Sequence, residues 1–326
     1  MRSKILLGVA VVAVFLCSYA GKMMVAGRGL QGDTAGQPAA GGAVPRGSFS
    51  RIVSLAPSIT ETLFALGLGE KVVGVTQFCD YPPEAIKIPK IGGYYDPNYE
   101  AIVVLHPDLV LLLDEHQEAK KNLSSTGLRV FPVNHRTISG IVDSIDTIGT
   151  LCGREKQAIA LLSDIQARVA RIKRKTADLP HPPAPSPSVE RGKRPHVLLS
   201  IGRSMGSGSK DACIAGKEGF YDAMIEIAGG ENVYSGTAVR FPLISPEGIA
   251  KLNPDVIIDL VADIAKVPGG KQALMAEWNE LKDVGAVRNG RVCILTGNHL
   301  MRPGPRFIQT VEDIAKAIHP EADWEK

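Results

Sequence analysis

The chain has 326 residues, of which 44% are hydrophobic and 22% are charged. This composition is typical of a folded protein with a large core, and a chain of this length usually forms more than one domain. The formal net charge is only +3, and the basic residues are scattered rather than gathered in one stripe. The sequence also lacks the familiar nucleic-acid-binding motifs, so we expect no nucleic-acid partner.

The N-terminus has the pattern of an export signal. Two basic residues precede an apolar run over residues 5–16, and small residues follow as far as Ala20. This pattern predicts a signal peptide over residues 1–20. Lipidation at Cys17 and an uncleaved N-terminal anchor are the alternatives, because the apolar run falls just short of the roughly 20 residues that span a bilayer. Each alternative predicts a periplasmic or other extracytoplasmic location.

Two later segments lack the large apolar side chains that a core needs. Residues 21–50 are rich in Gly, Ala and Gln, which predicts a flexible linker. Residues 180–195 are rich in Pro, which removes backbone donors and fixes φ, so we expect an extended, solvated insertion. These segments divide the chain into an N-terminal lobe at 51–150, a connecting helix at 151–179 and a C-terminal lobe at 196–326.

One phrase occurs in both lobes. The pattern E-x-I-x-x-L-x-P-D-[LV]-[VI] starts at Glu100 and again at Glu247. Ile and Leu three residues apart give a short helix one apolar face, the Pro ends that helix, and the β-branched run after the Asp begins a buried strand. The repeat predicts two related lobes.

Strand and helix patterns alternate along each lobe, as they do in parallel α/β sheets. The strand patterns lie at 52–55, 109–113, 130–133, 197–201, 256–260 and 292–295. Residues 154–177 carry apolar side chains three or four apart with no Pro or Gly among them, which predicts one long amphipathic helix between the lobes.

The cysteines beyond the signal form no CxxC pair, and an oxidising compartment permits disulfides between them. Small buried thiols, with one bridge between Cys213 and Cys293, are favoured over a metal site. The pairing is otherwise open among Cys79, Cys152, Cys213 and Cys293.

A family resemblance is carried by Arg51-Ile-Val-Ser-Leu-Ala-Pro-Ser-Ile-Thr-Glu-Thr-Leu-Phe-Ala-Leu-Gly67, Val73-Gly-Val and Asp80-Tyr-Pro-Pro-Glu-Ala. With the two repeated phrases, these segments resemble the periplasmic cobalamin and ferric-siderophore binding proteins of ABC importers. The resemblance implies two Rossmann-like α/β lobes with central parallel sheets, joined by a single long helix. It also implies a free monomer that takes a corrinoid or ferric chelate between its lobes and delivers it to a permease dimer.

The resemblance also implies ligand-binding residues. Phe78 and Tyr94 align with aromatic ligand contacts of the cobalamin binder, and both follow predicted strands, where ligands meet α/β lobes. Aromatic faces cover a macrocycle, while guanidinium groups bind amide carbonyls or offset an anionic chelate. His299 stands where the cobalamin binder has a tryptophan, and Arg306 is expected to contact ligand or to pair with an acidic neighbour. The predicted contacts are Phe78, Tyr94, Tyr95, Arg240, Phe241, His299 and Arg302.

Glu100 and Glu247 open the two repeated helices. The helix dipole alone favours an acidic residue in the first turn. In the family, the matching glutamates contact arginines of the two permease subunits, so the resemblance makes both residues docking anchors through charge-assisted pairs.

Enzyme motifs are missing: the sequence has no G-x-S-x-G elbow, no HExxH and no dinucleotide fingerprint, and the Gly-rich loop at 202–210 lacks P-loop spacing. Asp114-Glu-His116 with His135 is a candidate for a divalent metal, but a solvated acidic strand end is favoured. We therefore predict no catalysis and no resident cofactor. The alternatives are a haem receptor with Tyr94 or Tyr95 as axial ligand, a secreted α/β enzyme and a surface-tethered interaction module.

Overall fold

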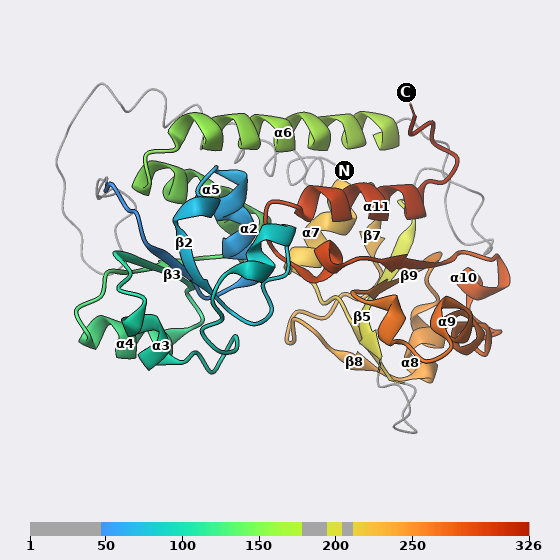
Figure 1. Ribbon diagram of the computed structural model, residues 1–326. Coiled ribbons are helices and arrows are strands. Elements are labelled where there is room, and N and C mark those ends of the chain that lie inside the picture. The colour runs from blue at the N-terminus through green and yellow to red at the C-terminus, as the bar shows by residue number, and fades with distance from the viewer. Residues whose placement is uncertain (1–46, 178–193, 204–210, 326) are drawn as a thin grey trace, which may run out of the picture. The chain divides into compact units, whose positions relative to one another are not determined.

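Two β-sheets and one long helix organise the chain in a computed structural model, which describes residues 47–177, 194–203 and 211–325 (Figure 1). The predicted signal peptide, most of the predicted linker and Pro-rich insertion, and most of the Gly-rich loop lie outside the described residues. None of the helices among the described residues has the length and apolar character needed to cross a membrane.

The N-terminal lobe contains a four-stranded parallel sheet in the order β2-β1-β3-β4. All five residues of β3 are buried, which explains the unbroken apolar run in the sequence. The strands are β1 (Ile52–Ser54), β2 (Val72–Val75), β3 (Leu109–Leu113) and β4 (Val130–Val133). The helices are α2 (Pro57–Ala65), η1 (Gly69–Lys71), η2 (Pro83–Lys87), α3 (Tyr99–Val104), α4 (Gln117–Ser125) and α5 (Ile138–Leu151).

The C-terminal lobe contains a sheet in the order β10-β9-β5-β6-β8, with β7 paired to β5. The predicted strands β5, β9 and β10 run parallel as expected, and β7 is also parallel to β5. β6, which no sequence pattern predicted, runs antiparallel to both of its neighbours, β5 and β8. Residues 204–211 between β5 and β6 are fewer than the dozen or more that a parallel crossover needs, so the chain must reverse.

The strands of this second sheet are β5 (His196–Arg203), β6 (Ala212–Ile214), β7 (Glu231–Asn232), β8 (Leu243–Ile244), β9 (Val256–Val261) and β10 (Val292–Thr296). The helices of the lobe are α7 (Phe220–Ile227), α8 (Pro246–Leu252), η3 (Ile264–Lys266), α9 (Gly270–Asn279), α10 (Gly285–Arg288), η4 (Asn298–Met301) and α11 (Phe307–Ile318).

The repeated phrase builds the same corner in both lobes. Asp108 exchanges backbone and side-chain hydrogen bonds with the backbone of Arg51 at the start of β1, at 2.9 and 3.0 Å. Asp255 makes the same exchange with His196 at the start of β5, at 2.8 Å for both bonds. The Asp of the phrase therefore pins the strand that it begins to the neighbouring parallel strand.

The predicted long helix is confirmed as α6 (Glu155–Ala177), which lies along α5 and α11 (Figure 1). Arg168 makes a bidentate pair with Glu312 of α11 at 3.0 and 2.7 Å, and Arg171 adds a bond of 2.9 Å. Although burial alone would raise it, the two guanidinium groups hold the pKa of Glu312 below its ordinary value. The C-terminal half of the helix is therefore fastened to the C-terminal lobe through Glu312.

The expected bridge between Cys213 and Cys293 is wrong, because the four described cysteines are free. Cys213 lies on β6 and Cys293 on β10, which are separated by β5 and β9 in the sheet. Three strand spacings of about 4.8 Å put these positions far beyond the reach of a disulfide. Cys79 and Cys152 are buried thiols, as the sequence analysis favoured over a metal site.

Candidate functional site

Three of the seven predicted ligand contacts, Phe78, Tyr94 and Tyr95, belong to the N-terminal lobe, where loops gather near the carboxyl ends of the parallel strands. Phe78 lies just beyond β2, residues 114–116 follow β3, and residues 134–136 follow β4. The backbone N–H of Gln77 donates to Gly92 O at 2.9 Å, which holds the loop at 92–98 beside the segment after β2. Loops from three strands therefore meet at one sheet edge, the usual place for a ligand in this type of fold.

Three rings gather at this edge. The Tyr94 ring meets Tyr95 edge-on at 4.7 Å between centroids and meets the His116 imidazole at 4.5 Å; Tyr95 lies 5.9 Å from His116. Tyr95 is 79% exposed, whereas His116 is only 5% exposed. The edge-on geometry is the one that aromatic pairs prefer. We name Tyr94, Tyr95 and His116 the ring cluster.

A polar chain supports the ring cluster. The Tyr94 hydroxyl donates to Glu115 Oε1 at 2.7 Å, and Arg136 lies 3.4 Å from Glu115 and 3.6 Å from Asp114. Burial first, and then the hydrogen bond and charge of Glu115, raise the pKa of Tyr94. Tyr94 is therefore a fixed neutral phenol, while the Tyr95 side chain extends into solvent.

His116 has no hydrogen-bond partner for either ring nitrogen among the described residues, although both nitrogens are buried. Burial lowers the pKa of His116 against the opposing charges of Glu115 and Asp114. The expected solvated acidic strand end is thus wrong for His116. An unpaired buried polar group costs about 1–3 kcal/mol, so its presence needs a reason.

A second cluster joins the lobes, and we name Glu61, Asp80, Arg302 and Arg306 the interlobe ion cluster. Arg306 makes a bidentate pair with Glu61 at 2.9 and 2.6 Å, and Arg302 approaches the same carboxylate at 3.4 Å. Arg302 also binds Asp80 and donates to Phe78 O at 3.3 Å. Although burial alone would raise it, Arg302 holds the pKa of Asp80 below its ordinary value.

Packing around this cluster is close. The Arg306 guanidinium lies 3.7 Å from the centre of the Tyr81 ring, and a Cβ added to Gly304 would lie 3.2 Å from Ser58 Cα. Tyr81 therefore stacks on an arginine of the other lobe. Of the two roles expected for Arg306, the structure shows the pairing with an acidic neighbour.

The predicted residues of the C-terminal lobe lie around η4. Phe241 is 42% exposed and meets the Tyr221 ring at 6.3 Å, and Tyr221 in turn donates to Leu300 O at 3.0 Å. Arg240 is exposed. His299 Nε2 lies 3.0 Å from Asp313 Oδ2 on α11, so its imidazole has a structural partner.

The predicted site residues thus fall into two groups. In the first group, Phe78 is 50% exposed and its carbonyl accepts from Arg302, while Phe241 contacts Tyr221, which donates to Leu300 O in η4. In the second group, Tyr94 and Tyr95 belong to the ring cluster. Sequence reasoning missed the roles of Glu61 and Glu115. Sequence reasoning grouped His116 with His135 and not with Tyr94 and Tyr95. The signal that could have placed His116 in the binding site is its position just after a buried strand.

The two predicted docking residues occupy matching places. Glu100 is the second residue of α3, which Asn98 caps, and Glu247 is the second residue of α8, which Ser245 caps. Both carboxylates are exposed. A bond from its own backbone N–H, and then one from Ser245, hold the pKa of Glu247 below its ordinary value. The repeat therefore presents one carboxylate at the same corner of each lobe.

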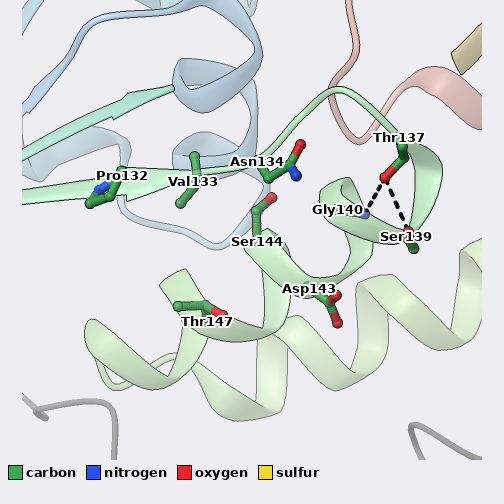
Figure 2. Close-up of a pocket in the computed structure, with 9 residues that line it drawn as sticks. All are labelled: Pro132, Val133, Asn134, Thr137, Ser139, Gly140, Asp143, Ser144 and Thr147. Carbon is green, nitrogen blue, oxygen red and sulfur yellow. Dashed lines mark hydrogen bonds between the residues drawn. The ribbon is translucent and has the colours of Figure 1, made fainter. Parts of the chain in front are cut away.

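A pocket of about 250 Å³ lies between β4 and the first turns of α5 (Figure 2). Thr137 caps the helix by accepting from the Gly140 N–H at 3.1 Å. Behind it, His135 bonds to Ser58 at 2.8 Å and to Ser144 at 2.7 Å, and burial lowers its pKa to about 3. Both of its ring nitrogens are engaged, so His135 is not available to share a metal with His116.

No group of three or more His, Cys, Asp or Glu side chains in the described part of the chain is arranged to hold a metal ion. Within that part, the site offers ring faces, carboxylates and paired arginines. These groups can bind a ligand reversibly through ring contacts and hydrogen bonds.

Comparison with known proteins agrees with this geometry. A family model described as "Periplasmic binding protein" matches residues 52–298. The chain belongs to this family. The resemblance drawn from the sequence is confirmed, as are the two-lobe α/β fold and the prediction that the protein is not an enzyme, because the family consists of binding proteins.

Two relatives are 32% identical. One is an uncharacterized ABC transporter substrate-binding lipoprotein, YvrC, of Bacillus subtilis (strain 168), aligned over 83% of this chain and 80% of that protein. The other is a cobalamin-binding protein of Halobacterium salinarum, aligned over 82% of this chain and 69% of that protein. Among solved structures, the apo periplasmic heme-binding protein RhuT from Roseiflexus sp. RS-1 matches with a TM-score of 0.66 and 26% identity, over 83% of this chain and 98% of that one.

Proposed function

We propose that this protein is the extracytoplasmic substrate-binding component of an ABC importer and that it captures a corrinoid between its two lobes. It is exported by its N-terminal segment and acts as a monomer that releases ligand to a membrane permease. Pocket shape and ring contacts hold the ligand, and no covalent chemistry is involved. Relatives that carry the names of an ABC substrate-binding lipoprotein and a cobalamin-binding protein support this function.

The observation that carries the choice of ligand is the chemistry beside the ring cluster. Asp114 and Glu115 place two carboxylates next to the rings, and the nearby cation, Arg136, is paired with both. Arg302 is likewise occupied by Asp80 and Glu61. Carboxylates accept hydrogen bonds from the amide side chains of a corrinoid but repel the negative charges of haem propionates or an anionic chelate.

Haem is the second candidate, and one observation favours it. Tyr95 presents a largely exposed phenol beside His116, and tyrosine is an established axial ligand of haem iron. Tyr94 is unsuited to that role, because its raised pKa disfavours the phenolate. Of the two tyrosines expected as axial ligands, the structure therefore favours Tyr95.

The partner is proposed to be a permease dimer that receives Glu100 and Glu247. Two exposed carboxylates at equivalent corners match a partner with two equivalent basic surfaces, because the lobes are related by the internal repeat. Helix-dipole stabilisation accounts for an acidic residue in each first turn but not for the repetition of the same exposed corner.

Calorimetric titration of the purified chain with cyanocobalamin, haemin and a ferric hydroxamate tests the ligand. We expect binding of cyanocobalamin and a clear loss of affinity in Tyr94→Ala, since an aromatic contact adds about 0.5–1.5 kcal/mol beyond its buried area. Ser163→Ala on α6, far along the chain from both sheet edges, serves as the control. Binding of haemin alone, lost in Tyr95→Phe, would replace the corrinoid with haem.

A further inference from the structure

His116 differs from another buried histidine of the same lobe. His135 is 3% exposed and has a serine hydroxyl on each ring nitrogen, whereas His116 is 5% exposed and has neither nitrogen paired among the described residues. The fold thus supplies partners where a histidine is structural. His116 instead keeps both nitrogens unused at the carboxyl edge of β3, the edge where the ligand is proposed to bind.

The neighbours of His116 fit a binding role. Tyr94 is fixed by its bond to Glu115 and supports one side of the imidazole, while Tyr95 packs edge-on against it and is 79% exposed. A side chain so exposed can turn away at little cost in contacts. We expect rotation of Tyr95 to break its ring contact with Tyr94 and to open one side of the imidazole, while the bond to Glu115 keeps Tyr94 in place.

We propose that His116 coordinates the metal of the captured macrocycle at an exchangeable axial position, which for a corrinoid is cobalt(III). This inference rests on the proposed function, because it concerns the same ligand at the same edge. One imidazole nitrogen gives its lone pair to cobalt and replaces one bound water, so no electron is transferred and no proton is required. Neither ring nitrogen of His116 is committed to a hydrogen bond among the described residues, which leaves a lone pair available for coordination.

Coordination also explains why a neutral ring stands beside carboxylates. Asp114 and Glu115 favour a positively charged partner at this edge, and a cobalt(III) corrinoid with water as its axial ligand carries that charge at the metal. The ring cluster then covers the macrocycle while His116 binds its centre.

Absorption spectra of the full chain with aquocobalamin and with cyanocobalamin test the proposal. In wild type we expect the bands of aquocobalamin to shift on binding, as exchange of water for imidazole requires, and those of cyanocobalamin to stay unchanged because cyanide holds the axial position. His116→Ala should abolish the shift and weaken aquocobalamin binding by roughly tenfold or more, as loss of a metal ligand does. Cyanocobalamin should still bind His116→Ala, which shows that the variant is folded.

His106→Asn is the matched control. His106 is exposed and has a φ of 45°, the same value as Asn253 at the equivalent place in the other lobe, so asparagine suits that backbone. This variant should retain the full shift. A shift that persists in His116→Ala, or no shift in wild type that binds cyanocobalamin, would overturn the assignment of His116 and leave the proposed function standing. If neither corrinoid binds, both the proposed corrinoid ligand and cobalt coordination by His116 are wrong. Haemin bands that change in His116→Ala would then make His116 the ligand of an iron macrocycle instead.

Discussion

Replacement of Glu61 by glutamine tests the interlobe ion cluster most directly. The Glu61 side chain is 1% exposed, and the side chains of Arg306 and Arg302 that contact it are 12% and 15% exposed. Glutamine keeps the size of the side chain but removes the charge, so Arg306 loses its counterion in a place that water does not reach. Removing one partner of a buried pair costs about 3–5 kcal/mol.

We expect the lower end of that range, about 3 kcal/mol, because Arg302 keeps Asp80 as a second partner. For a protein of this size, each kcal/mol lowers Tm by about 2–4 °C, so the melting temperature should fall by about 6–12 °C. Guanidinium chloride unfolding and thermal melting followed by circular dichroism measure the two quantities. Glu118→Gln, an exposed carboxylate on α4, is the control and should change stability by less than about 0.5 kcal/mol.

The double variant Glu61→Met with Arg306→Met separates the charge from the packing. Replacing both members of a buried pair by apolar groups is often neutral, so the double variant should be more stable than Glu61→Gln. A loss below about 1 kcal/mol in Glu61→Gln, with unchanged spectra, would refute the view that the arginines depend on this carboxylate.

Three further predictions follow from the same structure. Glu100→Lys with Glu247→Lys should block uptake in cells and leave ligand affinity in solution nearly unchanged; wild-type uptake would contradict the docking assignment. Asp80 has a lowered folded pKa, so its contribution to stability should be complete above its ordinary pKa and be lost as pH falls through the folded value. Asp80→Asn should therefore flatten the acid limb of a stability–pH curve, and an unchanged limb would count against the Arg302 pair. Because α6 is continuous and fastened to α11, scattering curves with and without ligand should show only a small change in radius of gyration, whereas a large fall would contradict a rigid connection.

Local patterns predicted most of the fold. The strands at 109–113 and 130–133 and the long helix at 154–177 agree with the structure to within one residue. Burial on both faces explains the clear apolar run of the first strand, and a 3.6-residue period explains the apolar pattern of the helix. The reversed direction of β6 left no such trace, because it depends on the length of the connection from β5 and on pairing between strands. The failed Cys213–Cys293 bridge likewise depends on the order of strands in the sheet, which no local pattern gives.

The site was predicted in part for the same reason. Tyr94 and Tyr95 were found because aromatic residues make up only 5% of this chain and these two lie together in a Gly-rich loop. Glu61 was missed because it lies within an apolar helix, and its partner Arg306 is 245 positions away. His116 was assigned to an acidic strand end, since no sequence pattern reveals that a ring is buried with both nitrogens unpaired.

The pairing of charges links the stability of the molecule to its choice of ligand. Arg302 was expected to face the ligand, yet it is committed to Asp80 and Glu61, and Arg136 is committed to Asp114 and Glu115. Both of these arginines offset carboxylates of the protein itself, which leaves Arg240 as the exposed arginine among the predicted ligand contacts. A binding surface built from rings and from carboxylates satisfied in this way discriminates against anionic chelates without any steric barrier. If the proposed corrinoid is the ligand, the contacts that hold the two lobes together also favour a macrocycle with amide side chains and a positively charged metal over an anionic chelate.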